Sequence, residues 1–218
     1  SEKVAYAVPS GNFGNALSAY IASKMGLNIE IIVCTNENDV LDQFFKSGIY
    51  RVRKGSDVKV TSSPSMDIAS ASNFERFIFD YVERDPAKVR ALWKELNEKR
   101  EFNIGKSEPG MAFGITSGSA TDADVLETIR GMYEKYEVVI DPHTAVAMKA
   151  GLEKRERGIP LVVIETAQPA KFADTMREAL GFETPIPKGY ESLANLSEHT
   201  MRMENDAKLV KQFIVENT

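Results

Sequence analysis

The chain has 218 residues, 43% hydrophobic and 27% charged, a composition typical of a soluble globular domain with a substantial core. Its net charge of −5 argues against nucleic acid or an anionic membrane surface as the main partner, and no apolar run approaches the roughly 18 residues of a transmembrane helix. A single cysteine, Cys34, excludes an internal disulfide and indicates a reducing, cytoplasmic setting.

The first 48 residues predict the order strand, helix, strand, helix. The apolar run 4–8 and the run 29–34, "IEIIVC", are each typical of a strand buried on both faces. Apolar residues recur at helical spacing over 13–25, and "ENDVLDQFFKSG" indicates a second helix that ends at Gly48. Strands that alternate with helices in this way favour right-handed crossovers and a parallel sheet.

The middle of the chain predicts two helices. Ser72 and Glu75 have the spacing of a capping box, which would start the first helix. Pro86 then favours a new helix that runs to about Lys99. We interpret residues 62–105 as a helical insertion at the edge of the sheet.

Regular alternation resumes in the last hundred residues. We expect a helix with Asp141 as its N-cap and Pro142 in its first turn. The expected strands are 137–140 and 159–166, and the expected helices are 122–136, 141–158, 167–181 and 205–217. The chain therefore predicts an α/β fold, an open, mainly parallel sheet with helices on both faces, as a single domain over residues 1–218.

The segment "VPSGNFGN" joins the first predicted strand to the first helix. A helix N-terminus presents free backbone N–H groups and a partial positive charge, so it can bind a phosphate without Lys or Arg. Gly11 and Gly14 would let the backbone close on the anion, while Ser10, Asn12 and Asn15 could add side-chain donors. The alternative is a plain strand–turn–helix junction with Ser as its cap.

Three more strand ends are polar: "CTNEND", "DPHTAVA" and "ETAQPAKF". Ligands of open α/β sheets bind outside the carboxyl ends of the strands, so all three would line the same edge as the loop. His143 could be a ligand residue or a helix-start residue with one satisfied hydrogen bond. Thr166 could be a ligand residue or could satisfy the backbone at a strand end.

Five ordered motifs, "VPSGNFGN", "TNENDVL", "SPSMDI…SNFER", "DPHTAVA" and "TAQPAKF", resemble those of threonine synthase, a pyridoxal-phosphate enzyme of fold type II. The resemblance implies the large domain of such an enzyme and the conversion of O-phospho-L-homoserine and water to L-threonine and phosphate. The residues that it implies for the cofactor phosphate are Ser10, Gly11, Asn12, Phe13, Gly14 and Asn15.

The same resemblance places the hydroxyl of Thr166 against the pyridine nitrogen of the cofactor. Such a partner does not enforce a protonated ring, so carbanion character can be steered from Cα to Cβ. His143 and Thr144 are implied as pocket residues, with Asn36 and Asp39 as further pocket candidates. One departure is visible: the family usually reads Thr-Ala-His-Pro-Ala-Lys-Phe, and here the histidine is replaced by glutamine at position 168.

The family's Schiff-base lysine lies in a Phe-Lys-Asp segment upstream of the phosphate loop, and these 218 residues contain no such segment. We interpret Lys171 as structural and expect no catalytic residue and no metal ligand in this chain. We therefore expect the C-terminal portion of the enzyme, without its N-terminal domain, with weak or no cofactor binding and no turnover alone. The alternatives are a non-catalytic phosphate-binding or assembly domain, or a related enzyme such as threonine dehydratase.

Overall fold

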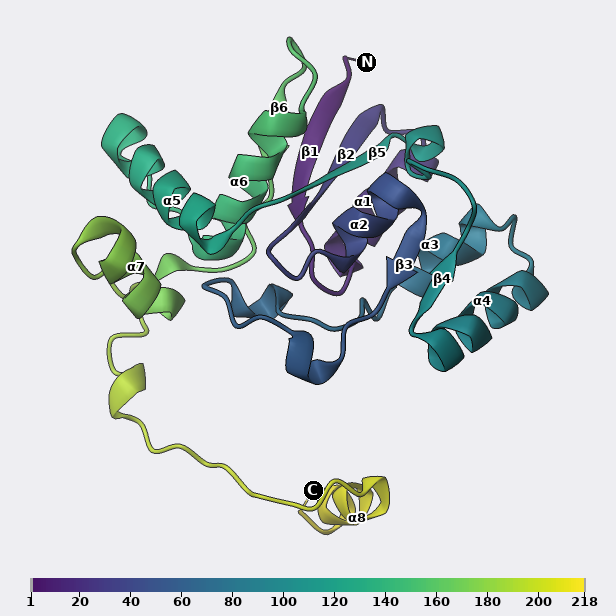
Figure 1. The fold of residues 1–218 in the computed structure, drawn as a ribbon. Coiled ribbons are helices and arrows are strands. Elements are labelled where there is room, and N and C mark those ends of the chain that lie inside the picture. Colours follow the sequence, from purple (N-terminus) through teal and green to yellow (C-terminus); the bar gives the residue numbers. More distant parts are fainter. Residues whose placement is uncertain (1, 218) are drawn as a thin grey trace. The chain divides into compact units, whose positions relative to one another are not determined.

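The computed structural model describes residues 2–217 and divides the chain into two compact units (Figure 1). The first unit ends at Thr184 and contains all the strands in the described residues. The second begins at Pro185 and contains the turn η5 (Leu193–Asn195) and the helix α8 (Ala207–Asn217), which confirms the final predicted helix. The prediction of a single domain over 1–218 stays a prediction.

The main sheet of the first unit has four parallel strands in the order β5-β2-β1-β6. Their bounds are Val4–Pro9 for β1, Ile29–Thr35 for β2, Ile115–Ser119 for β5 and Leu161–Val163 for β6. Because the strands are parallel, all their carboxyl ends lie at one edge of the sheet. This arrangement confirms the predicted α/β class with a parallel sheet.

Helices cover both faces of this sheet (Figure 1). On one face lie α1 (Gly14–Lys24) and α2 (Val40–Ser47), and on the other lies α6 (Pro142–Lys154). Helix α5 (Asp122–Tyr136) packs on the outside of α6, and α7 (Ala173–Leu180) packs on α5.

Alternate residues of one strand enter two different cores. Ile31 and Val33 of β2 are fully buried in the cluster beneath α1 and α2, whereas Ile32 and Cys34 are buried in the cluster beneath α6. Successive side chains of a strand point to opposite faces, so a continuous apolar run is what a strand with two covered faces requires. The sheet therefore separates two cores.

A short antiparallel pair and two helices extend the first core. The pair consists of β3 (Ile49–Arg51) and β4 (Glu101–Asn103), and the helices are α3 (Phe74–Tyr81) and α4 (Pro86–Lys99). Single 3₁₀ turns lie at Gly55–Asp57 (η1), Pro64–Met66 (η2), Met111–Phe113 (η3) and Pro169–Phe172 (η4). The interpretation of 62–105 as an insertion stays a prediction. Helix α3, which lies within this range, buries Phe74, Phe77 and Ile78 in the first core.

Two local predictions are wrong. Residues 137–140 form no strand; Glu137 adopts a left-handed conformation that ends α5, and Val138 is 44% exposed. The expected capping box at Ser72 is absent, because Asn73 is the N-cap of α3 and makes no side-chain cap bond. The backbone N–H of Ser72 instead donates to the side chain of Asn12, 3.3 Å away, which ties the start of α3 to the loop after β1.

Candidate anion and cofactor site at the sheet edge

The loop between β1 and α1 presents free backbone donors. Within the described part of the chain, the N–H groups of residues 11–16 have no protein acceptor, and the first helical bond runs from the N–H of Leu17 to the carbonyl of Phe13 at 2.9 Å. No side chain caps α1. Unpaired donors at a helix N-terminus form an anion-binding site, and buried donors of this kind are costly unless a ligand or water accepts from them.

Phe13 gives the loop its shape. Its φ of 66° lies in the left-handed region, which is unfavourable for a residue with a side chain. Its ring is fully buried and packs on Phe45, Phe74 and Phe77, with centroids 5.4 to 6.0 Å apart. Burial of this ring offsets the backbone strain, so the core below the sheet holds the loop in its conformation.

Gly11 allows the loop to touch the turn η2. A Cβ atom at Gly11 would lie 2.9 Å from the carbonyl oxygen of Ser65 and 3.1 Å from the Cα of Met66. Both neighbours are backbone atoms, so they cannot give way as a flexible side chain would. The loop and the turn η2 therefore form two walls that meet without space for a side chain.

A chain of hydrogen bonds holds the start of α6, which forms the third wall of the site. The carboxylate of Asp141, the N-cap of α6, accepts from the backbone N–H of His143 and lies 2.9 Å from the Nδ1 atom of the same residue. On the other side of the ring, Nε2 lies 3.2 Å from the N–H of Ser65 and accepts from it. Because Nε2 accepts, the hydrogen between His143 and Asp141 lies on Nδ1, and the ring connects α6 to the turn η2.

We expect Asp141→Asn to destabilise the protein by roughly 2–3 kcal/mol at pH 7, because an amide cannot accept from every donor of His143 and Thr144. Burial favours the neutral acid, but the hydrogen bonds from these residues outweigh it and hold the pKa of Asp141 below its ordinary value. The stabilisation is therefore present above about pH 4 and is lost as the pH falls below that value. Urea unfolding at pH 7 and pH 3 measures this difference; an equal loss at both would contradict it.

A cavity of about 220 Å³ lies where the three walls meet. Four of its residues were predicted as site residues, namely Gly11, Asn15, His143 and Thr166. The other lining residues are Pro9, Ser65, Met66, Ala167, Lys171 and Phe172. The expectation that the loop, "DPHTAVA" and "ETAQPAKF" share one edge of the sheet is therefore correct, although no strand precedes Asp141.

The other predicted site residues have partners outside this cavity. Ser10 donates its hydroxyl to the carbonyl of Val8 at 3.1 Å, and Thr144 donates its hydroxyl to Asp141. The side chain of Asn12 accepts from Ser72, while Phe13 lies in the core and Gly14 opens α1.

Asn36 and Asp39 hold neighbouring loops in place. The amide of Asn36 donates to Thr61 and Asp67, each at 2.8 Å, and Asp39 pairs with Arg53. Neither residue lines the 220 Å³ cavity. Their contribution to a ligand site stays a prediction.

Lys171, which the sequence pattern assigns a structural role, is the charged residue of this lining. It carries the permanent charge among the residues that line the cavity, and it forms no ion pair in the part of the chain that the structure describes. Its position in the sequence indicates a place at the site, because it lies five residues after Thr166 in the same polar segment. A single cation beside a set of backbone donors suits an anionic ligand.

Residues 2–217 contain no cluster of three or more His, Cys, Asp or Glu side chains that could hold a metal ion. In the same residues no helix combines the length and the apolar character needed to cross a membrane.

Comparison with known proteins gives a consistent result. A family model described as "Threonine synthase, C-terminal" matches residues 144–214. The threonine synthase of Methylobacillus glycogenes is 49% identical over 221 residues, which is 100% of this chain and 46% of the relative. The threonine synthase of Corynebacterium glutamicum is 42% identical, over 99% of this chain and 46% of the relative.

Two solved structures have the same fold. A PLP-bound threonine synthase from Brucella melitensis gives a TM-score of 0.89 at 35% identity, over 99% of this chain and 46% of that one. Threonine synthase from yeast gives 0.84 at 36% identity, over 98% and 47% of the two chains. The chain thus spans about half the length of the curated relatives and solved proteins that it matches.

Proposed function

The chain belongs to the threonine synthase family, and from that premise we propose that it forms part of an enzyme that converts O-phospho-L-homoserine and water to L-threonine and phosphate. The observation that carries the proposal is the set of backbone N–H groups of residues 11–16, which have no acceptor among the described residues and border a cavity lined by Thr166 and His143. These donors suit the phosphate of a cofactor.

The residues present fit pyridoxal phosphate. The loop 10–15 would hold its phosphate, because Gly11 lets the loop lie directly against the turn η2, where a Cβ atom would meet backbone. Thr166 lines the same cavity, and its hydroxyl would face the pyridine nitrogen. When bound, this cofactor supplies an electron-withdrawing ring that stabilises negative charge on a substrate carbon.

His143 has a positioning role in this proposal. Its Nε2 atom already accepts from Ser65, and its Nδ1 proton is held by Asp141, so neither ring nitrogen is free to move a substrate proton. The ring also packs on Phe172, with 4.9 Å between ring centroids. His143 would therefore keep the turn η2 and the "PAKF" segment at the distance that the bound cofactor requires.

Lys171 would supply the positive charge that the loop lacks. We expect Lys171→Gln to weaken the binding of pyridoxal phosphate by about three- to tenfold, because a single exposed charge contributes modestly in water. Lys171→Arg should retain most of the affinity, since it keeps the charge. Equilibrium dialysis at two salt concentrations measures the effect; equal affinities for the glutamine variant and the parent chain would contradict it.

A complete active site would need more than this chain. The relatives are about twice as long, and we propose that a segment outside residues 1–218 supplies the lysine amine that the family resemblance implies. We also propose a cytoplasmic setting, which the buried, unpaired thiol of Cys34 supports.

The test is complementation. Residues 1–218 are co-expressed with the N-terminal half of the Methylobacillus glycogenes enzyme, and the release of phosphate from O-phospho-L-homoserine is measured together with the formation of threonine. We expect turnover from the pair and none from either part alone. Consumption of threonine instead would favour a dehydratase, and cofactor binding by a stable but inactive pair would favour the non-catalytic alternative.

A further inference from the structure

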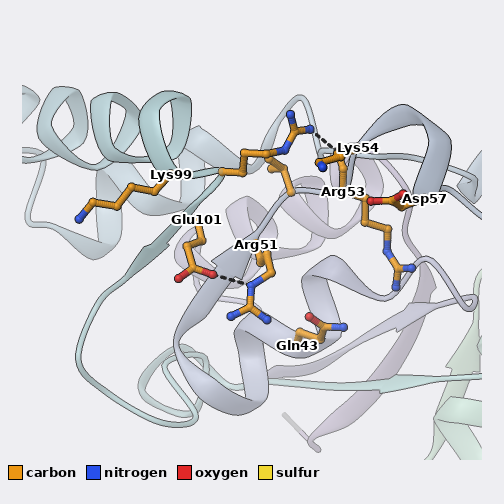
Figure 2. Close-up of a pocket in the computed structure, with 9 residues that line it drawn as sticks. Gln43, Arg51, Arg53, Lys54, Asp57, Lys99 and Glu101 are labelled. Atoms are coloured by element: carbon orange, nitrogen blue, oxygen red, sulfur yellow. Dashed lines mark hydrogen bonds and ion pairs between the residues drawn. The ribbon is translucent and has the colours of Figure 1, made fainter.

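A second and larger cavity, of about 480 Å³, lies among β3, β4, the segment after β3 and the end of α4 (Figure 2). We call it the basic cleft, and its lining residues are Gln43, Arg51, Val52, Arg53, Lys54, Asp57, Lys99, Arg100 and Glu101. None of these residues lines the cofactor cavity.

The charge of the basic cleft is opposite to that of the whole chain. Five of its residues are Lys or Arg and two are acidic, so its lining carries a net charge of +3, whereas the chain carries −5. A concave surface of one charge raises the local concentration of ions of opposite charge. The protein therefore concentrates positive charge at this one cavity against its overall balance.

Carboxylates occupy only some of these cations. Arg51 pairs with Glu101 across the two strands, and Arg53 pairs with Asp39. Lys99 pairs with Glu95 and points away from the other labelled side chains (Figure 2). Lys54 and Arg100 have no carboxylate partner among the residues that the structure describes. One nitrogen of Arg100 donates to the carbonyl of Arg53 at 2.8 Å, which leaves its other N–H groups available to a ligand.

The backbone fixes these cations in place. Arg51 stands opposite Glu101 in the antiparallel register. Arg100 ends α4 with a left-handed φ of 64°, and its carbonyl accepts from the N–H of Val52 at 2.9 Å. The guanidinium groups therefore project from a paired backbone rather than from a free loop, so less entropy is lost when they bind.

We propose that the basic cleft binds a small polyanion that carries two or more phosphate groups, at a site separate from the cofactor cavity. A guanidinium binds phosphate through two parallel hydrogen bonds, and Lys54 and Arg100, which no described carboxylate pairs, come from two sides of the cleft. The cleft volume of about 480 Å³ exceeds the space that one phosphate fills. The proposal does not depend on the family's reaction.

Isothermal titration calorimetry with inorganic pyrophosphate at low ionic strength tests this proposal on the 218-residue chain. At the basic cleft we expect one pyrophosphate per chain, in addition to any anion held by the loop 10–15. Its affinity should fall with added salt and exceed that of inorganic phosphate at the cleft. Lys54→Gln and Arg100→Gln should each weaken binding by about fivefold, and the double variant by more than tenfold. Lys54 is exposed and makes no side-chain hydrogen bond in the described residues, so its replacement leaves the fold intact.

Two matched controls locate the site. Lys94→Gln removes the same charge from α4 outside the cleft and should leave the affinity for pyrophosphate unchanged. Gly11→Ala weakens anion binding at the phosphate loop and should leave the affinity of the basic cleft for pyrophosphate unchanged. Undiminished binding in the double variant, loss of binding in Gly11→Ala, or the absence of saturable binding would each overturn the proposal. Gly11→Ala affects the cofactor cavity and not the basic cleft. The outcome for pyrophosphate at the cleft is therefore independent of the proposed enzyme function.

Discussion

Gly11→Ala is expected to weaken the binding of pyridoxal phosphate, and of inorganic phosphate, at the loop by about tenfold to a hundredfold while the chain stays folded. The added Cβ would meet the backbone of Ser65 at 2.9 Å, so the loop must move away from the turn η2. The N–H groups of residues 11–16 would then lose their common direction. Loss of one hydrogen bond to a charged group, at about 1.5–3 kcal/mol, gives this range.

Backbone amide shifts in ¹⁵N–¹H NMR spectra measure this effect even when binding is weak. In the parent chain, the shifts of residues 11–16 should saturate as phosphate is added, and in the variant they should not. Gly14→Ala is the matched control, because a Cβ there has its nearest neighbour, the side-chain nitrogen of Asn73, at an ordinary 3.6 Å. If the two alanine variants bind phosphate equally well, the role of Gly11 is refuted.

Phe13→Ala is expected to lower the free energy of unfolding by about 3–5 kcal/mol, a large part of the total for a domain of this size. The ring is fully buried among Phe45 of α2 and Phe74 and Phe77 of α3. Alanine would leave a cavity between these two helices. Urea unfolding followed by circular dichroism measures the loss. Phe79→Ala is the control; that ring is 37% exposed, so we expect a loss below about 1 kcal/mol.

The left-handed conformation of Phe13 adds a second, sharper expectation. Phe13→Gly removes the same ring but relieves the backbone strain at a φ of 66°, so it should be more stable than Phe13→Ala by about 1 kcal/mol. This order reverses the usual one, in which glycine is the more destabilising residue in a regular element. An alanine variant more stable than the glycine variant would show that the loop relaxes when the ring is removed.

The sequence predicts β1, α1, β2 and α2 well, because apolar runs and the glycines that end the helices are strong local signals. The N-cap at Asp141 is confirmed for the same reason: its carboxylate accepts from the N–H groups of His143 and Thr144, as the "DPHT" pattern indicates. The site edge is also predicted, because parallel topology brings the strand ends together whatever the exact strand lengths are.

The remaining parts depend on contacts that no local pattern contains. Strand β5 reads Ile-Thr-Ser-Gly-Ser, too small and polar to suggest a strand; its Gly118 is needed because a Cβ there would lie 3.1 Å from that of Ala150 on α6. Conversely, residues 137–140 pair with no strand, since Glu137 is left-handed and Val138 is exposed. Lys171 was assigned a structural role, since only the folded chain shows that it faces the cavity of Thr166.

Phe13 belongs both to the anion loop and to the aromatic core, so occupancy of the site and integrity of the core are thermodynamically linked. A ligand on the loop stabilises the native state, by roughly 2.7 kcal/mol at a hundred times its dissociation constant. By reciprocity, a substitution at Phe45 or Phe74 that shifts the ring of Phe13 changes ligand affinity without touching the ligand. Substitutions deep in this core would then be detected first as a weaker affinity for the ligand of the loop, and excess ligand would restore stability.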